Sequence, residues 1–493
     1  MKTYRLPCLL LFLTLVSCAN RPAPGTEQSV QTPPPNILLI VVDDLGYADF
    51  TPFAGHRGDV QTPNITRLGN QSTVYTQAYV TAPVCSPSRA GLLTGKNQFR
   101  WDGPASWGPG LPDSVRTLAE YLKEAGYATA KIGKNDLGQK FHRNDVREYP
   151  LHHGFDRFLG FSAHAHDYWH LSQDIYDRTP DPQNTSALLG PLMDDMGTKS
   201  YEEGYITDIL TDEAVNYLKM ERTEPYFLML SYNAVHHLIH EVPQRYLDKY
   251  DVAPIPNYDP EAGVTFEQRE PGSYSAYYDK YSRLGAIQDD DMRKYYLANL
   301  NNLDDNIGRV LDAVDERTII VFVSDNGGSP LTGADNSPLT GGKYALWEGG
   351  IRVPMAVRWP GEHTTGGTET DYVSALDLLP TLTAAAGVEV GDPTIDGMDL
   401  RQPDPNRTLV WKWQGNWAIR RGDYKLTNAR ENHWKSRPYR AYIAPIRDDA
   451  SLKLFNLADD PGERNDLVNE RPDLVEELRA AYLSWEARNL QVY

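Results

Sequence analysis

Four apolar segments of the chain each end in a short cluster of polar residues, and this repeated arrangement limits the possible folds more than any other feature. The segments read NILLIVV from Asn36, YATAKIG from Tyr127, PYFLMLS from Pro225 and TIIVFVS from Thr318. The first and last are unbroken runs rich in Val and Ile, which are typical of strands buried on both faces of a parallel sheet. We therefore expect a sheet in the interior of the molecule.

Helical patterns separate these segments. Residues 114–126, 205–220 and 293–316 carry apolar side chains three and four positions apart. This alternation predicts an α/β fold with a large, doubly wound, mixed or mostly parallel sheet flanked by helices. Ligands of such sheets bind beyond the carboxyl ends of the strands, so the polar clusters should meet there. The clusters comprise Asp43 and Asp44; Lys134, Asn135 and Asp136; Asn233, His236 and His237; and Asp325 and Asn326.

The pattern changes after residue 387. Short alternating runs at 416–428 and 452–460 precede a last helical segment at 471–489. We predict a main α/β domain over residues 36–399 and a smaller C-terminal α+β domain over 400–493, with a short antiparallel sheet and a helix.

Two long connections, 160–186 and 250–283, lack periodicity, and their Tyr, Trp and His content favours functional loops over disorder. The first contains HAHDYWH, in which His164, His166 and His170 also allow a zinc site. A substrate-binding loop is the better interpretation, because no cysteine accompanies the histidines.

The first 35 residues have the pattern of an export signal and a tether. Two basic residues precede LLLFLTLV, a run too short to span a bilayer as a stable helix. LVSC resembles a bacterial lipoprotein signal, so we predict a signal peptide over 1–17, a lipid on Cys18 and a Pro-rich tether over 18–35. Ala19 then favours export to the outer membrane or periplasm of a Gram-negative cell. The alternative is an ordinary secretory signal in which Cys18 is incidental.

The acidic side chains in two of the clusters indicate a metal site. Oxygen ligands favour Ca²⁺ or Mg²⁺ over zinc, and a nearby cation would keep adjacent carboxylates ionised. The alternative for each cluster alone is a helix cap or an Asx turn after a strand. The candidate ligands are Asp43, Asp44, Asp325 and Asn326.

Cys85 is the one cysteine that lies beyond the predicted signal and lipid site. A lone cysteine in an exported chain is either buried and inert or kept for chemistry. Its setting, CSPSR, favours chemistry, because Arg89 places a fixed cation nearby and Pro87 interrupts a helix that would otherwise continue through the site.

The segment CSPSRAGLLTG, residues 85–95, resembles the signature of the type I sulfatases in the alkaline-phosphatase-like superfamily. VDDLGYADF, TPNITRL, GGKYALWEGGIRVP and LFNLADDPGERNDL support the resemblance, which runs from about Asn36 to Leu467. It implies that a maturation enzyme oxidises Cys85 to formylglycine, whose hydrate attacks the sulfur of a sulfate ester. It also implies one bound Ca²⁺, held by Asp43, Asp44, Asp325 and Asn326 together with the modified Cys85.

The resemblance gives roles to further side chains. Arg89 would hold the nucleophile, and Asp325 would also accept its proton. Lys134 and Lys343 match lysines that bind the sulfate group, although a surface lysine is the alternative for each. His236 matches the histidine that protonates the leaving oxygen, in preference to His237.

One position departs from the family pattern. The family commonly has Gly-Lys-Trp-His-Leu-Gly where this chain has GKNDLG, so Asp136 occupies the place of a catalytic histidine. We expect Asp136 to act as the base for sulfate release, its charge tolerated beside Lys134 and the cation. The alternatives are that it binds a sugar hydroxyl or that another histidine moves in.

Export and aromatic loops favour a sulfated polysaccharide or oligosaccharide as substrate. The net charge of −19 argues against nucleic acid as a partner but not against an anionic substrate in a locally basic cleft. The basic stretch NHWKSRPYR, with Lys435, Arg437 and Arg440, is either a further anion contact or a solvated surface. Two alternative functions are hydrolysis of phosphate or phosphonate monoesters and glycan binding without turnover.

Overall fold

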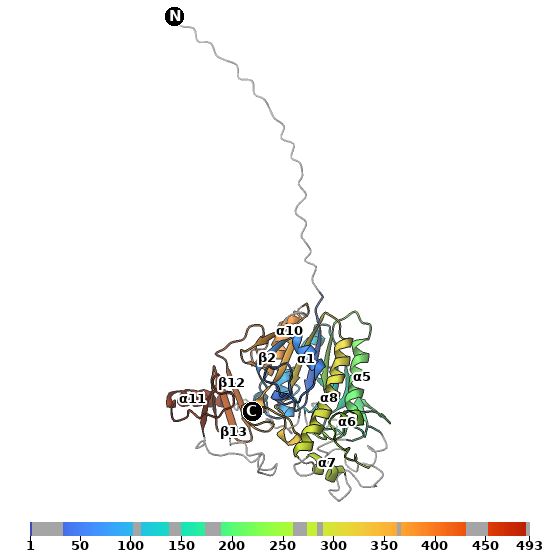
Figure 1. The fold of residues 1–493 in the computed structure, drawn as a ribbon. Coiled ribbons are helices and arrows are strands. Elements are labelled where there is room, and N and C mark those ends of the chain that lie inside the picture. Colours follow the sequence, from blue (N-terminus) through green and yellow to red (C-terminus); the bar gives the residue numbers. More distant parts are fainter. Residues whose placement is uncertain are drawn as a thin grey trace. The chain divides into compact units, whose positions relative to one another are not determined.

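The computed structural model describes Met1 and residues 33–101, 110–137, 149–172, 189–259, 274–282, 289–361, 366–429 and 452–489. Residues 34–493 form one compact unit (Figure 1). The predicted signal peptide, Cys18, nearly all of the tether and the basic stretch at 432–440 lie outside the described residues. No helix in the described part of the chain is both long and apolar enough to cross a membrane.

The four strands predicted from the sequence are neighbours in the main sheet. β1 (Asn36–Val42) lies between β7 (Tyr226–Ser231) and β8 (Thr318–Ser324), and β3 (Ala128–Lys134) pairs with the other edge of β7. All three pairings are parallel, and in register Val41 lies opposite Ser231 and Val42 opposite Ser324. The polar clusters that follow these strands therefore emerge level with one another.

Further strands extend the sheet in both directions, in the order β10-β2-β9-β8-β1-β7-β3-β4-β5-β6 with β11 beside β2. β4 continues the parallel core, whereas β9, β2, β5 and β6 introduce antiparallel pairings. The prediction of a large, mixed and mostly parallel sheet is confirmed. The added strands are β2 (Thr73–Tyr79), β4 (Arg157–Phe161), β5 (Leu192–Asp194), β6 (Gly197–Lys199), β9 (Arg352–Arg358), β10 (Gly367–Glu369) and β11 (Val373–Ser374).

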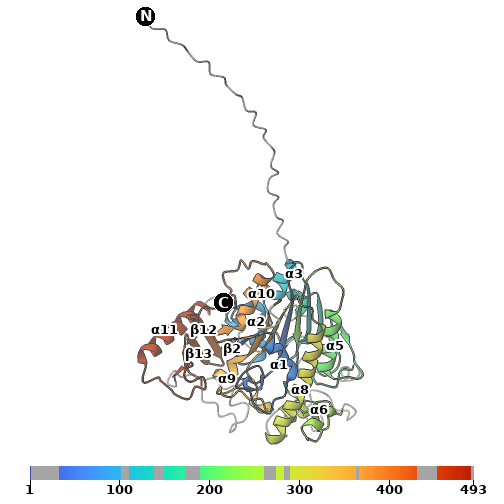
Figure 2. The same ribbon diagram turned by 45° about the horizontal axis from the view of Figure 1, so that its top comes forward.

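Helices cover both faces of this sheet, because alternate side chains of its central strands are apolar on both sides (Figure 2). Leu38, Ile40 and Val42 of β1 pack in the core under one set of helices, and Ile37, Leu39 and Val41 pack under the other. The first set is α1 (Pro63–Asn70), α5 (Ile206–Leu218) and α8 (Asp289–Ala313), and the second is α2 (Cys85–Thr94), α3 (Leu118–Glu124) and α10 (Leu378–Ala385).

A small antiparallel sheet and a helix form the C-terminal region, as predicted. Trp417 of the sheet stacks on Tyr482 of the helix, with ring centroids 4.1 Å apart. The division predicted at residues 399 and 400 stays a prediction. The elements are β12 (Thr408–Trp413), β13 (Asn416–Arg421), β14 (Tyr424–Thr427), β15 (Lys453–Asn456) and α11 (Pro472–Asn489).

The connection over 250–283 contains a helix that the sequence analysis does not anticipate. α7 (Tyr274–Ser282) carries tyrosines at 274, 277, 278 and 281, which is helical spacing. Tyr274 is fully buried, whereas Tyr277, Tyr278 and Tyr281 bury only part of their surface, so the apolar periodicity of the segment is weak. The other short helices are α6 (Gln244–Lys249) and α9 (Glu348–Ile351).

Candidate active site

The ends of β1 and β8 bring the predicted carboxylates together. Asp43 follows β1, and Asp325 follows β8, where its backbone N–H donates to the carbonyl of Val42 at 3.0 Å. Asp44 has a φ of 59°, so the chain turns sharply there and its carboxylate faces the end of β8. The amide of Asn326 donates to Asp44 Oδ1 at 2.7 Å, and the backbone N–H of Asp44 donates to Asp325 Oδ1 at 3.3 Å. These residues form the strand-end cluster.

Helix α2 points its first residue at this cluster. Cys85 begins the helix, and its Sγ lies 3.5 Å from Asp43 Oδ1. Pro87 lies in the first turn, where a missing N–H breaks no helical bond, so it starts the helix rather than interrupting it. Arg89, one turn further on, binds Asp325 Oδ2 through Nε and Nη2, both at 2.8 Å.

Both predicted lysines are buried ion-pair partners, not surface residues. Lys134 Nζ lies 2.6 Å from Asp43 Oδ2, and Lys343 Nζ lies 2.8 Å from Asp44 Oδ1. Lys134 is fully buried and Lys343 is 5% exposed. Each of the two ammonium groups therefore forms an ion pair with one of the two adjacent carboxylates that follow β1.

His236 is the histidine that the structure places against the carboxylates. Its Nε2 lies 3.8 Å from Asp44 Oδ2, and the ring of His237 packs edge-on against it with centroids 4.3 Å apart. Both histidines belong to the turn after β7, which is tied to β1 by the bond from the backbone N–H of Val235 to the carbonyl of Asp43 at 2.8 Å.

Burial and mutual repulsion perturb the carboxylates. Burial acts to raise the pKa of Asp43, but Lys134 and Arg89 outweigh it and hold that pKa below its ordinary value. Burial raises the pKa of Asp44 to about 6, with Lys343 opposing the shift and Asp43 adding to it. Burial, followed by Asp43, also raises the pKa of Asp325. The neighbouring lysines and Arg89 therefore do not supply enough positive charge to keep the pKa of Asp44 and Asp325 at ordinary values.

The donor set fits a hard divalent cation. Asp43, Asp44, Cys85 and His236 form the one group of potential metal ligands in the described ranges, with ligand atoms all within 4.8 Å of one another. Oδ1 of Asn326 is buried beside them without a hydrogen-bond partner, and an unpaired buried oxygen of this kind calls for a ligand. The oxygen donors of this site, from Asp43, Asp44 and Asn326, suit Ca²⁺.

Asp136 lies at the edge of the same cluster. Its Oδ2 is 3.3 Å from Lys134 Nζ, and its backbone N–H donates to the carbonyl of Ser162 at 3.2 Å. Burial raises the pKa of Asp136 above its ordinary value, and Lys134 and Arg89 oppose that shift. A carboxylate with a raised pKa is a better proton acceptor than an exposed one.

The structure also adds a residue that the sequence analysis missed. The hydroxyl of Ser231, the last residue of β7, accepts a hydrogen bond from Arg89 Nη1. Nothing in the sequence around Ser231 distinguishes it from any serine at a strand end. Its position in register with Val41 and Gly133 is what brings it to the site.

The three histidines considered for zinc make separate contacts. His164 Nε2 lies 3.1 Å from the hydroxyl of Tyr278, whereas His166 and His170 contact Asp167 through its carbonyl and its carboxylate. Within the described residues they do not gather as a metal group.

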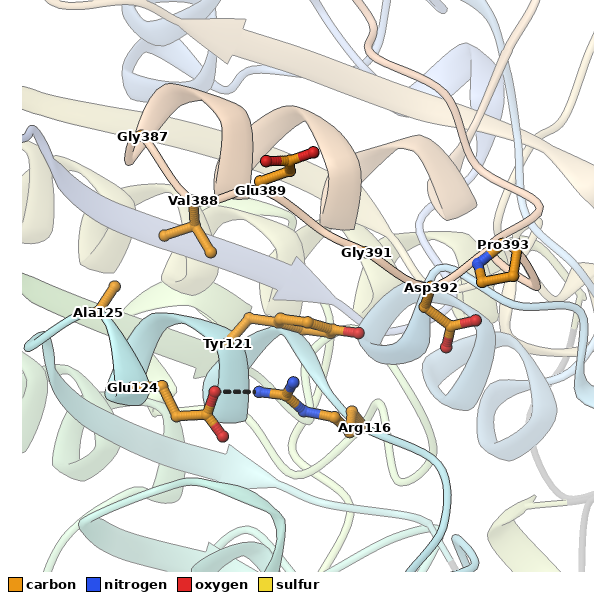
Figure 3. Close-up of a pocket in the computed structure, with 10 residues that line it drawn as sticks. All are labelled: Arg116, Tyr121, Glu124, Ala125, Gly387, Val388, Glu389, Gly391, Asp392 and Pro393. Carbon is orange, nitrogen blue, oxygen red and sulfur yellow. Dashed lines mark ion pairs between the residues drawn. The ribbon is translucent and has the colours of Figure 1, made fainter.

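A separate groove of about 730 Å³ opens between the end of α3 and the turn after α10 (Figure 3). Arg116 spans it, paired with Glu124 at 2.6 Å and lying 3.9 Å from the centre of the Tyr121 ring. Because α3 leads into the amino end of β3, the groove lies at the opposite end of the sheet from the strand-end cluster.

Comparison with known proteins agrees with this geometry. Residues 35–388 match the family model "Sulfatase", and residues 342–484 match "N-sulphoglucosamine sulphohydrolase, C-terminal". The chain is 30% identical to steryl-sulfatase of Mus musculus, over 89% of this chain and 79% of that protein. It is also 30% identical to arylsulfatase A of Bos taurus, over 93% and 88%.

A solved structure shares the whole fold. The crystal structure of Ps i-CgsB in complex with k-i-k-neocarrahexaose aligns with a TM-score of 0.73 and 27% identity, over 93% of this chain and 94% of that one. The chain therefore belongs to the type I sulfatases, sulfuric ester hydrolases of the alkaline-phosphatase-like superfamily.

Proposed function

We propose that this sulfatase hydrolyses sulfate esters of a carbohydrate, an oligosaccharide or polysaccharide, with calcium bound in the strand-end cluster and Cys85 converted to formylglycine. The observation that carries the proposal is the convergence of Cys85, Arg89, both lysines and His236 on the cluster of carboxylates. The relative Ps i-CgsB, whose structure holds a neocarrahexaose, supports a carbohydrate substrate.

Each side chain has a part that follows from its charge and position. Asp43, Asp44, Asp325 and Asn326 would hold the calcium ion. When bound, calcium neutralises charge on the sulfate oxygens, and hydrated formylglycine supplies the nucleophilic hydroxyl. Asp325, oriented by Arg89, is placed to accept the nucleophile's proton.

The remaining groups act on the ester. Lys134 and Lys343 face the space beside Asp43 and Asp44 and bind sulfate oxygens by charge. His236 delivers a proton to the departing sugar oxygen. Asp136, next to Lys134, accepts the proton that must leave when sulfate is released.

The modification of Cys85 is the first point to test. Protein made together with a maturation enzyme should yield a peptide across Cys85 whose mass has changed from that of a thiol to that of an aldehyde. An unmodified thiol, under conditions that convert a control sulfatase, would contradict the proposed nucleophile. Converted protein should hydrolyse 4-nitrophenyl sulfate in preference to 4-nitrophenyl phosphate, which separates sulfatase activity from phosphate monoester hydrolysis.

Calcium has its own test. A chelator should lower both the turnover of 4-nitrophenyl sulfate and the unfolding temperature, because a ligand that binds the folded state stabilises it. Ca²⁺ should restore both quantities. If the unfolding temperature does not change after complete removal of divalent ions, the strand-end cluster does not bind the proposed calcium ion.

We further propose export and lipid anchoring through Cys18, on the sequence pattern of residues 1–18. Full-length protein expressed in a Gram-negative host should enter the detergent phase on phase separation, and Cys18→Ser should leave it in the aqueous phase. Equal partitioning of the two forms would indicate an ordinary secretory signal.

A further inference from the structure

Three rings that no part of the catalytic assignment uses lie beside His236 or beside its two neighbouring rings. His237 lies 4.3 Å from His236 between ring centroids, and His164 lies 6.2 Å from it. Tyr278 of α7 is the third ring, and its centroid lies 6.1 Å from that of His164 and 6.2 Å from that of His237. These three residues, His164, His237 and Tyr278, form the ring wall. They come from three segments, the loop after β4, the turn after β7 and helix α7.

The ring wall offers polar atoms to a ligand. Nδ1 of His237 and Nδ1 of His236 are both buried without a hydrogen-bond partner. Buried nitrogens are nearly always paired in folded proteins, so two adjacent unpaired imidazole nitrogens indicate a ligand that brings its own donors or acceptors. His164 and Tyr278 are only half-buried, which leaves the wall open to solvent on their side.

The chemistry of the wall suits a hydroxyl group. Neutral imidazole and phenol each both donate and accept hydrogen bonds, as a sugar hydroxyl does, whereas a sulfate group only accepts. Nε2 of His164 and the hydroxyl of Tyr278 lie 3.1 Å apart, so the wall presents an imidazole and a phenol side by side.

We propose that the ring wall is the subsite for the leaving group, and that it binds a sugar ring through the free hydroxyl next to the scissile sulfate ester. The position of the wall around His236, the proposed proton donor, carries this assignment. It rests on the proposed function and narrows it: the preferred substrate has an uncharged hydroxyl, not a second sulfate, beside the ester that is cleaved.

The test uses converted full-length enzyme and three kinds of substrate. A panel of galactose monosulfates identifies the ester that is cleaved. The analogue that lacks the neighbouring hydroxyl, and the disulfate that carries a second sulfate there, are then compared with it. We expect each change to lower kcat/KM by at least about 10-fold, because the wall is left with unpaired groups or faces a misplaced anion. A disulfate that is cleaved faster than the monosulfate would overturn the inference.

A matched pair of variants assigns the effect to the wall. Tyr278→Phe removes one hydroxyl and should lower kcat/KM for the galactose monosulfate about 10-fold more than for 4-nitrophenyl sulfate, whose leaving group has no hydroxyl beside the ester. Tyr281→Phe, the same change one turn along α7, should alter neither. An equal loss on both substrates in Tyr278→Phe would mean a structural role, and an unchanged ratio would mean that Tyr278 does not meet the sugar.

Failure of this inference is distinguishable from failure of the proposed function. Hydrolysis of 4-nitrophenyl sulfate with no turnover of any galactose monosulfate contradicts the sugar subsite and leaves the sulfatase activity standing. Absence of hydrolysis of every sulfate ester by converted enzyme contradicts the proposed function itself.

Discussion

At the scale of single residues, Lys343 belongs to the ion-pair cluster and is proposed to bind the sulfate group. Its ammonium group is buried and lies 2.8 Å from Asp44 Oδ1, where a fixed charge acts strongly on a bound anion. We expect Lys343→Met to lower kcat/KM for 4-nitrophenyl sulfate by at least about 100-fold. Lys294→Met, which removes a half-exposed lysine from α8, is the control and should leave kcat/KM as it was. A loss of less than a few-fold in Lys343→Met would mean that this lysine does not contact the sulfate.

Asp136 gives a separate prediction, because the proposed function assigns it to the second half of the reaction. Asp136→Asn keeps the shape of the side chain but cannot accept a proton. Steady-state turnover should fall about 100-fold, while the first turnover still releases 4-nitrophenol in a rapid burst equal to the enzyme present. Stopped-flow absorbance measures both phases. Unaltered turnover, or equal loss of the burst and the steady state, would remove Asp136 from this role.

At the scale of elements, the contact between α8 and α1 depends on one buried carboxylate. Asp304 of α8 accepts hydrogen bonds from the backbone N–H groups of Asn64 and Ile65 at 3.1 and 2.8 Å, in the first turn of α1. Burial nevertheless raises the pKa of Asp304 from 3.8 to about 6. The folded state then holds this proton more tightly than the unfolded chain does, so the stability that protonated Asp304 contributes is lost as pH rises from about 4 to about 6.

Asp304→Asn removes that titration. Between pH 4 and pH 7 the wild type should lose about 2 kcal/mol of unfolding free energy relative to the variant, as measured by urea unfolding at both pH values. Asp312→Asn, on the exposed side of the same helix, should give a pH profile parallel to that of the wild type. If Asp304→Asn also runs parallel to the wild type, the raised pKa is wrong.

The elements also show which parts of the molecule the sequence could predict. β1, β7, β8 and β3 are apolar runs long enough to be recognised locally, and parallel pairing brings their ends to one edge without further information. Ser231 and the partnership of His164 with Tyr278 could not be found this way, because each depends on register or on the packing of a long loop. The sequence pattern did not predict helix α7, because its periodic residues are tyrosines, which are not clearly apolar.

At the scale of the whole molecule, a buried ion cluster connects the C-terminal sheet to the active-site loop. Lys425 of β14 lies 3.0 Å from Glu348 and 2.8 Å from Glu463, and all three are buried. The carboxylate of Glu463 also accepts from the backbone N–H of Glu348 at 2.6 Å. Glu348 follows the loop that carries Lys343, so the C-terminal region holds that loop in place.

Lys425→Met should remove the cation that two buried carboxylates share, and among the described residues only Glu348 keeps another one, Arg352 at 3.7 Å. We expect a loss of about 3–5 kcal/mol of unfolding free energy, with lower turnover because the Lys343 loop loosens. Adding Glu463→Gln should recover part of the stability, since one unpaired charge is removed. Lys412→Met breaks a half-exposed pair with Glu486 and serves as the control, with an expected loss below about 1 kcal/mol. Denaturant unfolding of the wild type and the three variants measures these free energies. Equal losses in Lys425→Met and Lys412→Met would contradict the proposed link between the C-terminal sheet and the Lys343 loop.

If Cys85 is converted to formylglycine as proposed, its burial fixes when this modification takes place relative to folding. Only 3% of this residue is exposed once α2 has packed. A maturation enzyme could therefore bind the segment around Cys85 only while that segment is still unfolded. The oxidation proposed for the Cys85 thiol would therefore have to come before folding, in a time set by how fast the core closes. A molecule that folds first keeps a thiol for as long as it stays folded. The active fraction of any preparation thus records a competition between two rates during synthesis, and slower folding should raise it.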